Sequence, residues 1–336
     1  MESLRSIAKR TGVSVATISN VLNGKGKVSP DKRDEISRLL IECGHDIKKF
    51  ALPQENSGKR RIRLFYPDLS VIKNDIFFNA QLSGILTVAS ENQCEVSIVP
   101  LERKHDGKIN ANDLAGCDGV IIINPRDDES FLSDIIQSQT PYVIMGRPAS
   151  HRRSVNYVDA DNVAIAYNAT MYLLKHGHRA IAFMTGPNVF TVNVDRMEGY
   201  KMALNTWGIP YDKELTLVAE YTMDSAHSTM KDFLEKDKRF TAIIANADML
   251  ALGVVNALTA FEKHIPNDVS VLCGSETSFT VSCTPPITGM DLNGYELGAQ
   301  TMRLLIDIMD KLLIKTTHIH VPFTLIERST VRSITT

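Results

Sequence analysis

Short apolar segments alternate with longer segments of helical periodicity from about residue 61 to the end of the chain. Short, continuous apolar runs fit buried strands, whereas apolar residues that recur every three to four positions fit amphipathic helices. The predicted strands are Ile62–Tyr66, Val96–Val99, Gly119–Ile123, Tyr142–Met145, Ala180–Met184, Leu215–Ala219, Ala242–Ala245 and Val269–Cys273. The predicted helices between them are Phe77–Glu91, Asn162–Lys175, Arg196–Trp207, Ser225–Glu235, Met249–Lys263 and Gly294–Leu312. This alternation predicts an α/β fold in which parallel sheets are covered by helices.

Two of the strand-like segments begin in a similar way, namely residues 61–67 (RIRLFYP) and residues 179–187 (RAIAFMTGP). This similarity predicts that residues 61–336 form two similar lobes, each a doubly wound parallel sheet. Ligands of such sheets bind beyond the carboxyl ends of the strands, so a cleft between two lobes is the expected binding site.

The chain has 336 residues, which exceeds what one compact core usually supports, and its 43% hydrophobic and 23% charged residues are typical of a globular protein. Its longest apolar runs, such as Gly119–Ile123, are far shorter than the roughly 20 residues that cross a bilayer. The N-terminus carries Glu2 and lacks the apolar stretch of a signal peptide. We therefore expect a cytoplasmic protein without a membrane span.

The cysteines and histidines give no pattern of a metal centre. The five cysteines are scattered along the chain and have no close pair at metal-ligand spacing: Cys43, Cys94, Cys117, Cys273 and Cys283. They are expected to be reduced residues of a cytosolic protein, and no cofactor is expected. No nucleophile–base pair of recognisable spacing occurs, so an enzyme is not expected either.

Positive charge is concentrated at the N-terminal end. Residues 1–60 contain 12 Lys and Arg against 7 Asp and Glu, although the net charge of the whole chain is -2. Local positive charge favours DNA, because neutralising phosphates releases condensed counterions.

The N-terminal segment has the pattern of a helix-turn-helix. Residues 3–10 place Leu4, Ile7 and Ala8 on one helical face, and the pattern breaks at Gly12. Ser14 is positioned to cap a second helix that runs to Leu22, and a third helix is expected to begin near Pro30. Two short helices joined by a tight glycine turn form the helix-turn-helix unit. The alternative is a small three-helix unit that contacts no DNA.

Residues 13–24 (VSVATISNVLNG), followed by Val28-Ser29-Pro30, closely resemble the DNA-binding headpiece of the LacI/GalR family of bacterial repressors. The resemblance implies that Val15, Ala16 and Asn20 read bases, and that four further residues mainly hold phosphates: Ser14, Thr17, Ser19 and Asn23. Outward side chains reach base edges, whereas hydroxyls and amides near a helix N-terminus contact the backbone. The family often has Arg where this chain has Asn20. Since Arg favours guanine and Asn favours adenine, we expect a different operator preference.

The linker, residues 48–60, departs from that family. Its relatives fold a hinge helix there and insert a Leu into the minor groove, which kinks the duplex. The aligned position here is Gln54, so Leu52 is the nearby aliphatic candidate for this DNA contact, and Pro53 interrupts a continuous helix. Two possibilities stay open: a shorter helix that starts at Pro53, or a flexible tether with basic residues at its ends.

The remainder of the chain resembles the two-lobed core of the same family, which shares the fold of periplasmic sugar-binding proteins. The segments that carry this resemblance are residues 67–70, 176–179, 196–200, 247–253 and 266–271. By family position, the effector cleft contains Ser70, Phe77, Asn124, Arg147, Arg196, Asn246, Asp248 and Ser275. Forked donors, a carboxylate and an aromatic face suit a sugar, a sugar phosphate or a nucleobase.

Three positions depart from the core pattern. The loop over residues 71–76 is longer than in the family, Ala247 replaces a common Asn, and Gly274-Ser275 stand where an aromatic residue and Asp are frequent. Fewer polar anchors therefore remain in the cleft, and Arg147 and Arg196 have a second interpretation as salt-bridge formers between the lobes.

The domains expected from these patterns are a headpiece (1–47), a linker (48–60) and an effector-binding and dimerisation core (61–336). The predicted function is a homodimeric regulator, most simply a repressor, that binds operator DNA under the control of a small molecule. Two alternatives stay open: a regulator whose altered cleft is controlled by a protein partner, and a solute-binding protein.

Overall fold

The structure is a computed structural model that describes residues 3–22, 32, 36, 39, 40, 43, 59–66, 75–100, 111–124, 135–149, 153–236, 238–312 and 315–334. Contacts divide the chain into two compact units, residues 1–59 and 60–336. Each unit is described separately below.

The N-terminal unit contains two short helices on a small apolar core. Helix α1 (Leu4–Thr11) is capped by Ser3, whose side chain accepts from the Ser6 N–H, and it ends at Gly12 in the left-handed conformation with φ of 68°. Helix α2 (Val15–Leu22) follows after a short turn. The core consists of Ile7, Ala8, Ile18, Val21, Ile36 and Leu40. Most of the predicted third helix lies outside the described residues, but Ile36 and Leu40 are four apart and both buried, as one helical face requires.

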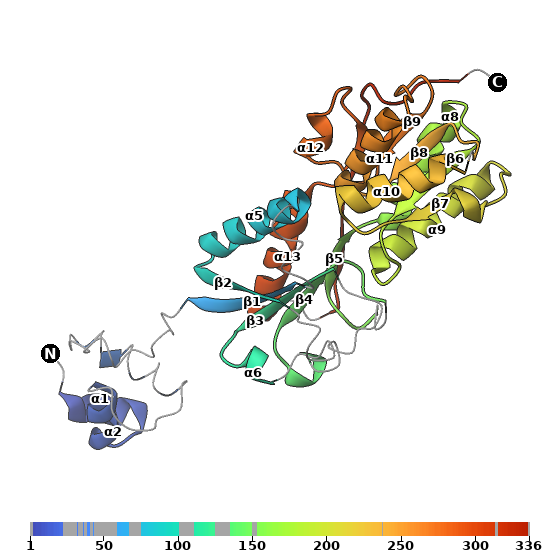
Figure 1. Ribbon diagram of the computed structural model, residues 1–336. Coiled ribbons are helices and arrows are strands. Elements are labelled where there is room, and N and C mark those ends of the chain that lie inside the picture. The colour runs from blue at the N-terminus through green and yellow to red at the C-terminus, as the bar shows by residue number, and fades with distance from the viewer. Residues whose placement is uncertain are drawn as a thin grey trace. The chain divides into compact units, whose positions relative to one another are not determined.

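Residues 60–336 form two lobes, each around a six-stranded sheet (Figure 1). The sheet of lobe 1 is parallel throughout, in the order β11-β5-β4-β3-β1-β2. Its strands are β1 (Arg60–Tyr66), β2 (Cys94–Pro100), β3 (Gly119–Ile123), β4 (Tyr142–Met145), β5 (Tyr157–Ala160) and β11 (His318–Val321). All five residues of β3 are buried, which explains its uninterrupted apolar sequence.

The sheet of lobe 2 has the order β12-β10-β9-β8-β6-β7 and is parallel except for the antiparallel pair of β10 and β12. Its strands are β6 (Ile181–Thr185), β7 (Thr216–Val218), β8 (Ala242–Ala245), β9 (Ser270–Cys273), β10 (Thr288–Asp291) and β12 (Thr324–Ile326). Along β6, Ile181 and Phe183 enter one apolar core, whereas Ala182 and Met184 enter the core on the opposite face. Both faces are therefore covered, as in doubly wound folds.

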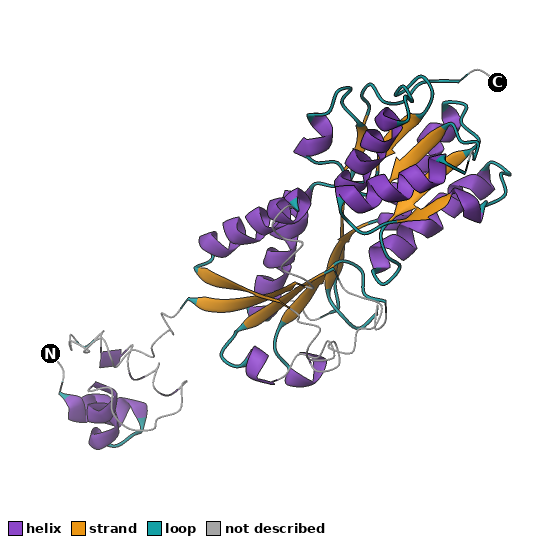
Figure 2. Cartoon of the chain, in the orientation of Figure 1, coloured by secondary structure: helices purple, strands orange, loops and turns teal. Residues whose placement is uncertain are grey.

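The helices pack in pairs on these sheets (Figure 2). In lobe 1, α5 (Ile76–Glu91) packs against α13 (Gly294–Met309), and the short α6 (Ala111–Leu114) precedes β3. In lobe 2, α8 (Asn162–Lys175) pairs with α9 (Thr191–Thr206), and α10 (Met223–Leu234) pairs with α11 (Asp248–Ala260). The remaining short elements are the 3-10 helix η2 (Lys213–Leu215) and α12 (Ser278–Val281).

The chain crosses between the lobes three times, from β5 to α8, from β10 to α13 and from β11 to β12. Helix α13 returns to lobe 1, where it contacts α5 and the sheet, although β10 belongs to lobe 2. At this crossing Asn293 has a left-handed φ of 51°. The two lobes are therefore interlaced in sequence.

Each of the eight predicted strands corresponds to an observed strand, with ends that differ by two residues or fewer, and the predicted α/β class is confirmed. The sequence patterns missed β5, β10, β11 and β12. These strands are three or four residues long and carry polar residues, such as Asp159 and His320, so they lack an apolar run. Among the described residues, no helix is long and apolar enough to cross a membrane.

Candidate functional site

The outward face of α2 presents the three residues predicted to read bases. Val15, Ala16 and Asn20 are exposed, while Ile18 and Val21 on the opposite face are buried in the headpiece core. A helix held by its apolar face, with short side chains and an amide outward, is the arrangement that enters a major groove.

The predicted phosphate-contacting residues Ser14 and Thr17 lie together at the start of α2. The Ser14 hydroxyl oxygen accepts from the Thr17 backbone N–H over 3.1 Å and lies 2.8 Å from the Thr17 hydroxyl. Ser14 therefore caps the helix, as its position before Val15 predicts. Ser19 is half-buried on the same helix, whereas Asn23, Leu52 and the linker lie outside the described residues.

A narrow cavity of about 50 Å³ lies between the two lobes of the core. Four of the predicted effector residues line it: Phe77, Asn124, Arg147 and Arg196. Asn246, Asp248 and Ser275 do not line it, and Ser70 lies outside the described residues. The other lining residues include Gln81, Asp159, Asn162, Thr191 and Leu292, so both lobes and two of the crossing segments contribute.

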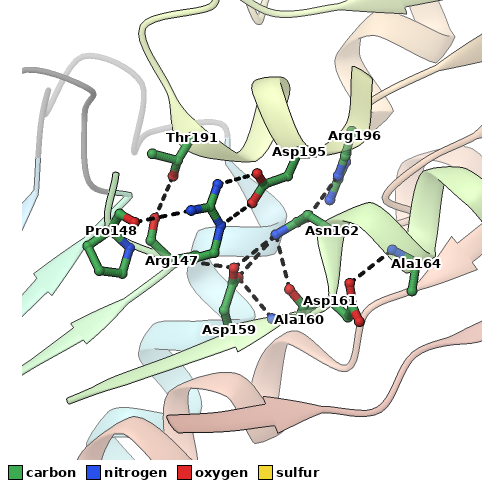
Figure 3. A network of polar contacts seen from close by, with 10 residues as sticks. All are labelled: Arg147, Pro148, Asp159, Ala160, Asp161, Asn162, Ala164, Thr191, Asp195 and Arg196. Carbon is green, nitrogen blue, oxygen red and sulfur yellow. Dashed lines mark hydrogen bonds and ion pairs between the residues drawn. The ribbon is translucent and has the colours of Figure 1, made fainter. Parts of the chain in front are cut away.

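Arg147 joins the two lobes (Figure 3). It follows β4 in lobe 1, and its guanidinium forms a bidentate ion pair with Asp195 of α9 in lobe 2, with Nε 2.6 Å from Oδ2 and Nη2 bonded to Oδ1. The Thr191 hydroxyl, one turn earlier on α9, donates to the Arg147 carbonyl over 2.7 Å. The interpretation of Arg147 as a salt-bridge former between lobes therefore fits this geometry.

Arg196 is buried in lobe 2 and bonded to amides. Its Nε donates to the Asn162 side-chain oxygen over 2.9 Å, and its Nη1 donates to the carbonyl and side-chain oxygens of Asn246. Among the described residues, no acceptor bonds to Nη2 and no carboxylate forms an ion pair with this guanidinium. Burial lowers the pKa of Arg196, as desolvation of a cation requires.

Asn246 holds Arg196 in place from behind the cavity. Its amide nitrogen donates to the Thr185 hydroxyl over 3.2 Å and to the Asn193 side-chain oxygen over 3.3 Å, while Tyr221 donates to that same Asn193 oxygen. The predicted effector residue Asn246 is thus a support for the wall of the cavity in this closed arrangement.

Asp248 and Ser275 have internal partners. The Asp248 carboxylate accepts from the Thr277 hydroxyl and from the Met249 N–H, each over 2.7 Å. The Ser275 carbonyl accepts from the thiol of Cys273 over 3.1 Å. Burial raises the pKa of Asp248, and burial also raises that of Asp75 in lobe 1, with the charge of Asp248 adding to the latter.

The sequence patterns missed Asp159, Asn162 and Asp195. Asp159 accepts from three groups: the backbone N–H of Arg147 over 3.1 Å, that of Ala160 over 2.9 Å, and the side chain of Asn162 over 3.1 Å (Figure 3). Burial, with the nearby charge of Asp195, nevertheless raises the pKa of Asp159 to about 7. The sequence Asp159-Ala160-Asp161-Asn162 directly before a predicted helix was the available signal, since polar residues there end a strand and cap a helix.

Family models match both units of the chain. A model of bacterial regulatory proteins of the lacI family matches residues 3–45, and a model of a periplasmic binding protein-like domain matches residues 170–331. The chain therefore contains a lacI-family helix-turn-helix domain and a periplasmic binding protein-like domain.

LacI-family relatives match nearly the full length. The HTH-type transcriptional regulator CelR of Thermobifida fusca is 27% identical over 309 residues, covering 91% of each chain. Catabolite control protein A of Priestia megaterium is 25% identical over 324 residues, covering 95% of this chain and 96% of that protein. A solved CelR–cellobiose complex matches with a TM-score of 0.76 and 26% identity over 98% of this chain and all of that chain. Together with the lacI-family helix-turn-helix domain, these relatives identify the chain as a DNA-binding transcriptional regulator and not an enzyme.

In the part of the chain that the structure describes, no three His, Cys, Asp or Glu residues cluster as a metal centre would require. The cysteines also act as ordinary core residues. Burial raises the pKa of the thiols of Cys94, Cys117 and Cys283, so these side chains are poor nucleophiles.

Proposed function

We propose that the headpiece reads operator DNA through Val15, Ala16 and Asn20, with Ser14, Thr17, Ser19 and Asn23 at the phosphates. The observation that carries this proposal is the exposed face of α2, which presents the three base-reading candidates over a helix whose other face is buried. Asn can pair bidentately with adenine, so Asn20 gives an adenine preference at its base pair. Leu52 stays the candidate for a linker contact in the minor groove.

Selection of bound DNA from a random library tests these assigned base contacts. The wild-type chain is expected to enrich a site with adenine at one symmetric position, and Asn20→Arg is expected to change that position to guanine. Asn168→Arg adds the same charge to an exposed face of α8 in the core and serves as the control. An unchanged site for Asn20→Arg, or a changed site for the control, would contradict the assignment.

The same proposal includes a cytoplasmic homodimer on a pseudo-palindromic operator. A single headpiece reads only a short half-site, and a two-fold symmetric dimer matches two such half-sites. Helix α5 supports this assembly with a shallow groove along one face, lined by residues that include Leu82 and the exposed Leu86. The partner of that face is a second copy of the chain.

The effector in this proposal is a sugar or a related polar metabolite that binds between the lobes. Arg196 offers a buried forked donor whose Nη2 has no acceptor among the described residues, and Phe77 offers an apolar face for a ring. The relative CelR is solved with cellobiose, which supports the sugar class over a sugar phosphate or a nucleobase. By family position, the contacts come from Ser70, Phe77, Asn124, Arg147, Arg196, Asn246, Asp248 and Ser275.

Thermal melting with panels of sugars, sugar phosphates and nucleobases tests the effector class, because a ligand that binds the folded state raises the melting temperature. A sugar is expected to raise the melting temperature of the wild type and to lose this effect in Arg196→Lys, which removes the guanidinium fork. Lys201→Gln, an exposed change on the same helix, is the control.

The small cavity favours a second candidate, a regulator that responds to a protein partner, since the closed cleft holds about 50 Å³. If no compound of the three panels raises the melting temperature, this candidate is favoured. The solute-binding alternative has no support, because the relatives that match are regulators.

A further inference from the structure

The two lobes of the core are joined by a side-chain contact as well as by the three chain crossings. Arg147 is fixed to lobe 1, where its backbone N–H donates to Asp159 over 3.1 Å. Its guanidinium reaches α9 of lobe 2 and forms the bidentate pair with Asp195. The two side chains are only 16% and 6% exposed, so the pair is largely shielded from water.

The first two turns of α9 contact Arg147 at two points. Asp195 binds the guanidinium, and Thr191, four residues earlier on the same helix face, donates to the Arg147 carbonyl over 2.7 Å. Both bonds run from lobe 2 to lobe 1, and both would break if the lobes moved apart. A bidentate pair also fixes orientation, because both guanidinium N–H groups must align with the carboxylate.

The cavity beside this pair is narrow. Its volume is about 50 Å³, whereas ligand pockets span roughly 300 to 1,000 Å³. The two lobes therefore lie close together here, and the Arg147–Asp195 pair spans the cleft at this place.

We propose that the Arg147–Asp195 ion pair is a latch that holds the interlobe cleft closed in the absence of effector. The closed state is then the default state of this regulator, and an effector enters only after the pair has opened. Opening returns both charges to water, whereas removing one partner leaves the other charge buried and unpaired in the closed state. Loss of either partner therefore shifts the core towards the open state. This inference goes beyond the proposed function, because it concerns the chain without effector or DNA.

The distance between the lobes in the full-length protein tests the latch. Spin labels are introduced as noncanonical residues at Gln137 in lobe 1 and Asp232 in lobe 2, both exposed. Labelled chains are mixed with an excess of unlabelled chains, so that only distances within one chain are measured by double electron–electron resonance. The wild type is compared with Asp195→Asn, Arg147→Gln and the double variant. Glu198→Gln, an exposed carboxylate on the same helix, is the matched control.

The wild type and Glu198→Gln are expected to show one short distance. Each single latch variant is expected to lower the ratio of closed to open molecules by about tenfold or more. The double variant is expected to be no more open than either single variant, because both changes remove the same contact and the double variant leaves no charge unpaired. Closed distances in both single variants, or additive effects in the double variant, would overturn the proposal. A melting curve for each variant verifies that both lobes stay folded. If either Asp195→Asn or Arg147→Gln does not fold, the other single variant still tests the latch. Since neither DNA nor effector is added, the result is independent of the operator and of the effector class.

Discussion

The carboxyl group of Asp159 accepts several hydrogen bonds, but it is buried where its charged form is unfavourable. Three N–H groups bond to it, from Arg147, Ala160 and Asn162, yet burial and the charge of Asp195 raise its pKa from 3.8 to about 7. Burial therefore outweighs the hydrogen bonds at this residue. The folded chain binds a proton at Asp159 more tightly than the unfolded chain does.

Replacing Asp159 by Asn is expected to flatten the pH dependence of stability. Since the folded pKa is raised, the stabilisation from protonated Asp159 is complete below pH 3.8 and is lost as the pH rises through about 7. Between pH 5 and 8 the free energy of unfolding of the wild type should fall by about 2 kcal/mol relative to Asp159→Asn. Urea unfolding at constant ionic strength measures this difference. Parallel pH profiles for the two proteins would show that Asp159 does not titrate in this range.

Helices α5 and α13 pack closely enough for their backbones to come into contact. A Cβ added at Gly84 of α5 would overlap the Tyr295 carbonyl oxygen of α13, and a Cβ at Gly298 of α13 would overlap the Gln81 carbonyl oxygen of α5. Two glycines facing each other thus allow the two backbones to touch. Since Gln81 and Leu297 line the cavity, this packing also sets one wall of the cleft.

Gly84→Ala is expected to destabilise the core although alanine is the better helix former. The added methyl group meets backbone atoms, which cannot rotate away, so the two helices must separate at a cost of about 2 to 3 kcal/mol. Ser83→Ala, at the exposed neighbouring position, is the control and should change stability by less than about 0.5 kcal/mol. Urea unfolding compares the two variants. Equal stability of Gly84→Ala and the wild type would mean that α5 and α13 are less closely packed than described.

The proposed dimer couples two headpieces through the core. The proposed dimer face on α5 exposes Leu86, which is 45% accessible in the single chain, beside polar residues such as Ser83 and Thr87. An exposed apolar side chain in a groove that polar residues also line fits an interface that is covered only in the assembly.

Leu86→Asp is expected to convert the protein to a monomer in sedimentation velocity. Binding to a full palindromic operator should then weaken by about 100-fold, because the second headpiece no longer binds as part of one molecule. Binding to a single half-site should stay the same. Met202→Asp places the same charge on an exposed apolar position of α9 and serves as the control. A dimeric Leu86→Asp variant would exclude this face as the interface.

The sequence by itself determined the local elements and the family. Local features depend only on neighbouring residues, so they can be predicted without knowing the tertiary structure. Examples are the helical spacing, the caps at Ser3 and Ser14, and the apolar runs of β3 and β8. The family resemblance predicted eight effector-binding positions, and four of these residues line the cavity. Only the tertiary structure decided what Arg147 binds, because Asp195 is 48 residues away and joins it through the approach of two lobes. The return of α13 to lobe 1, the raised pKa of Asp159 and the small cavity likewise result from contacts between distant segments, which no local pattern records.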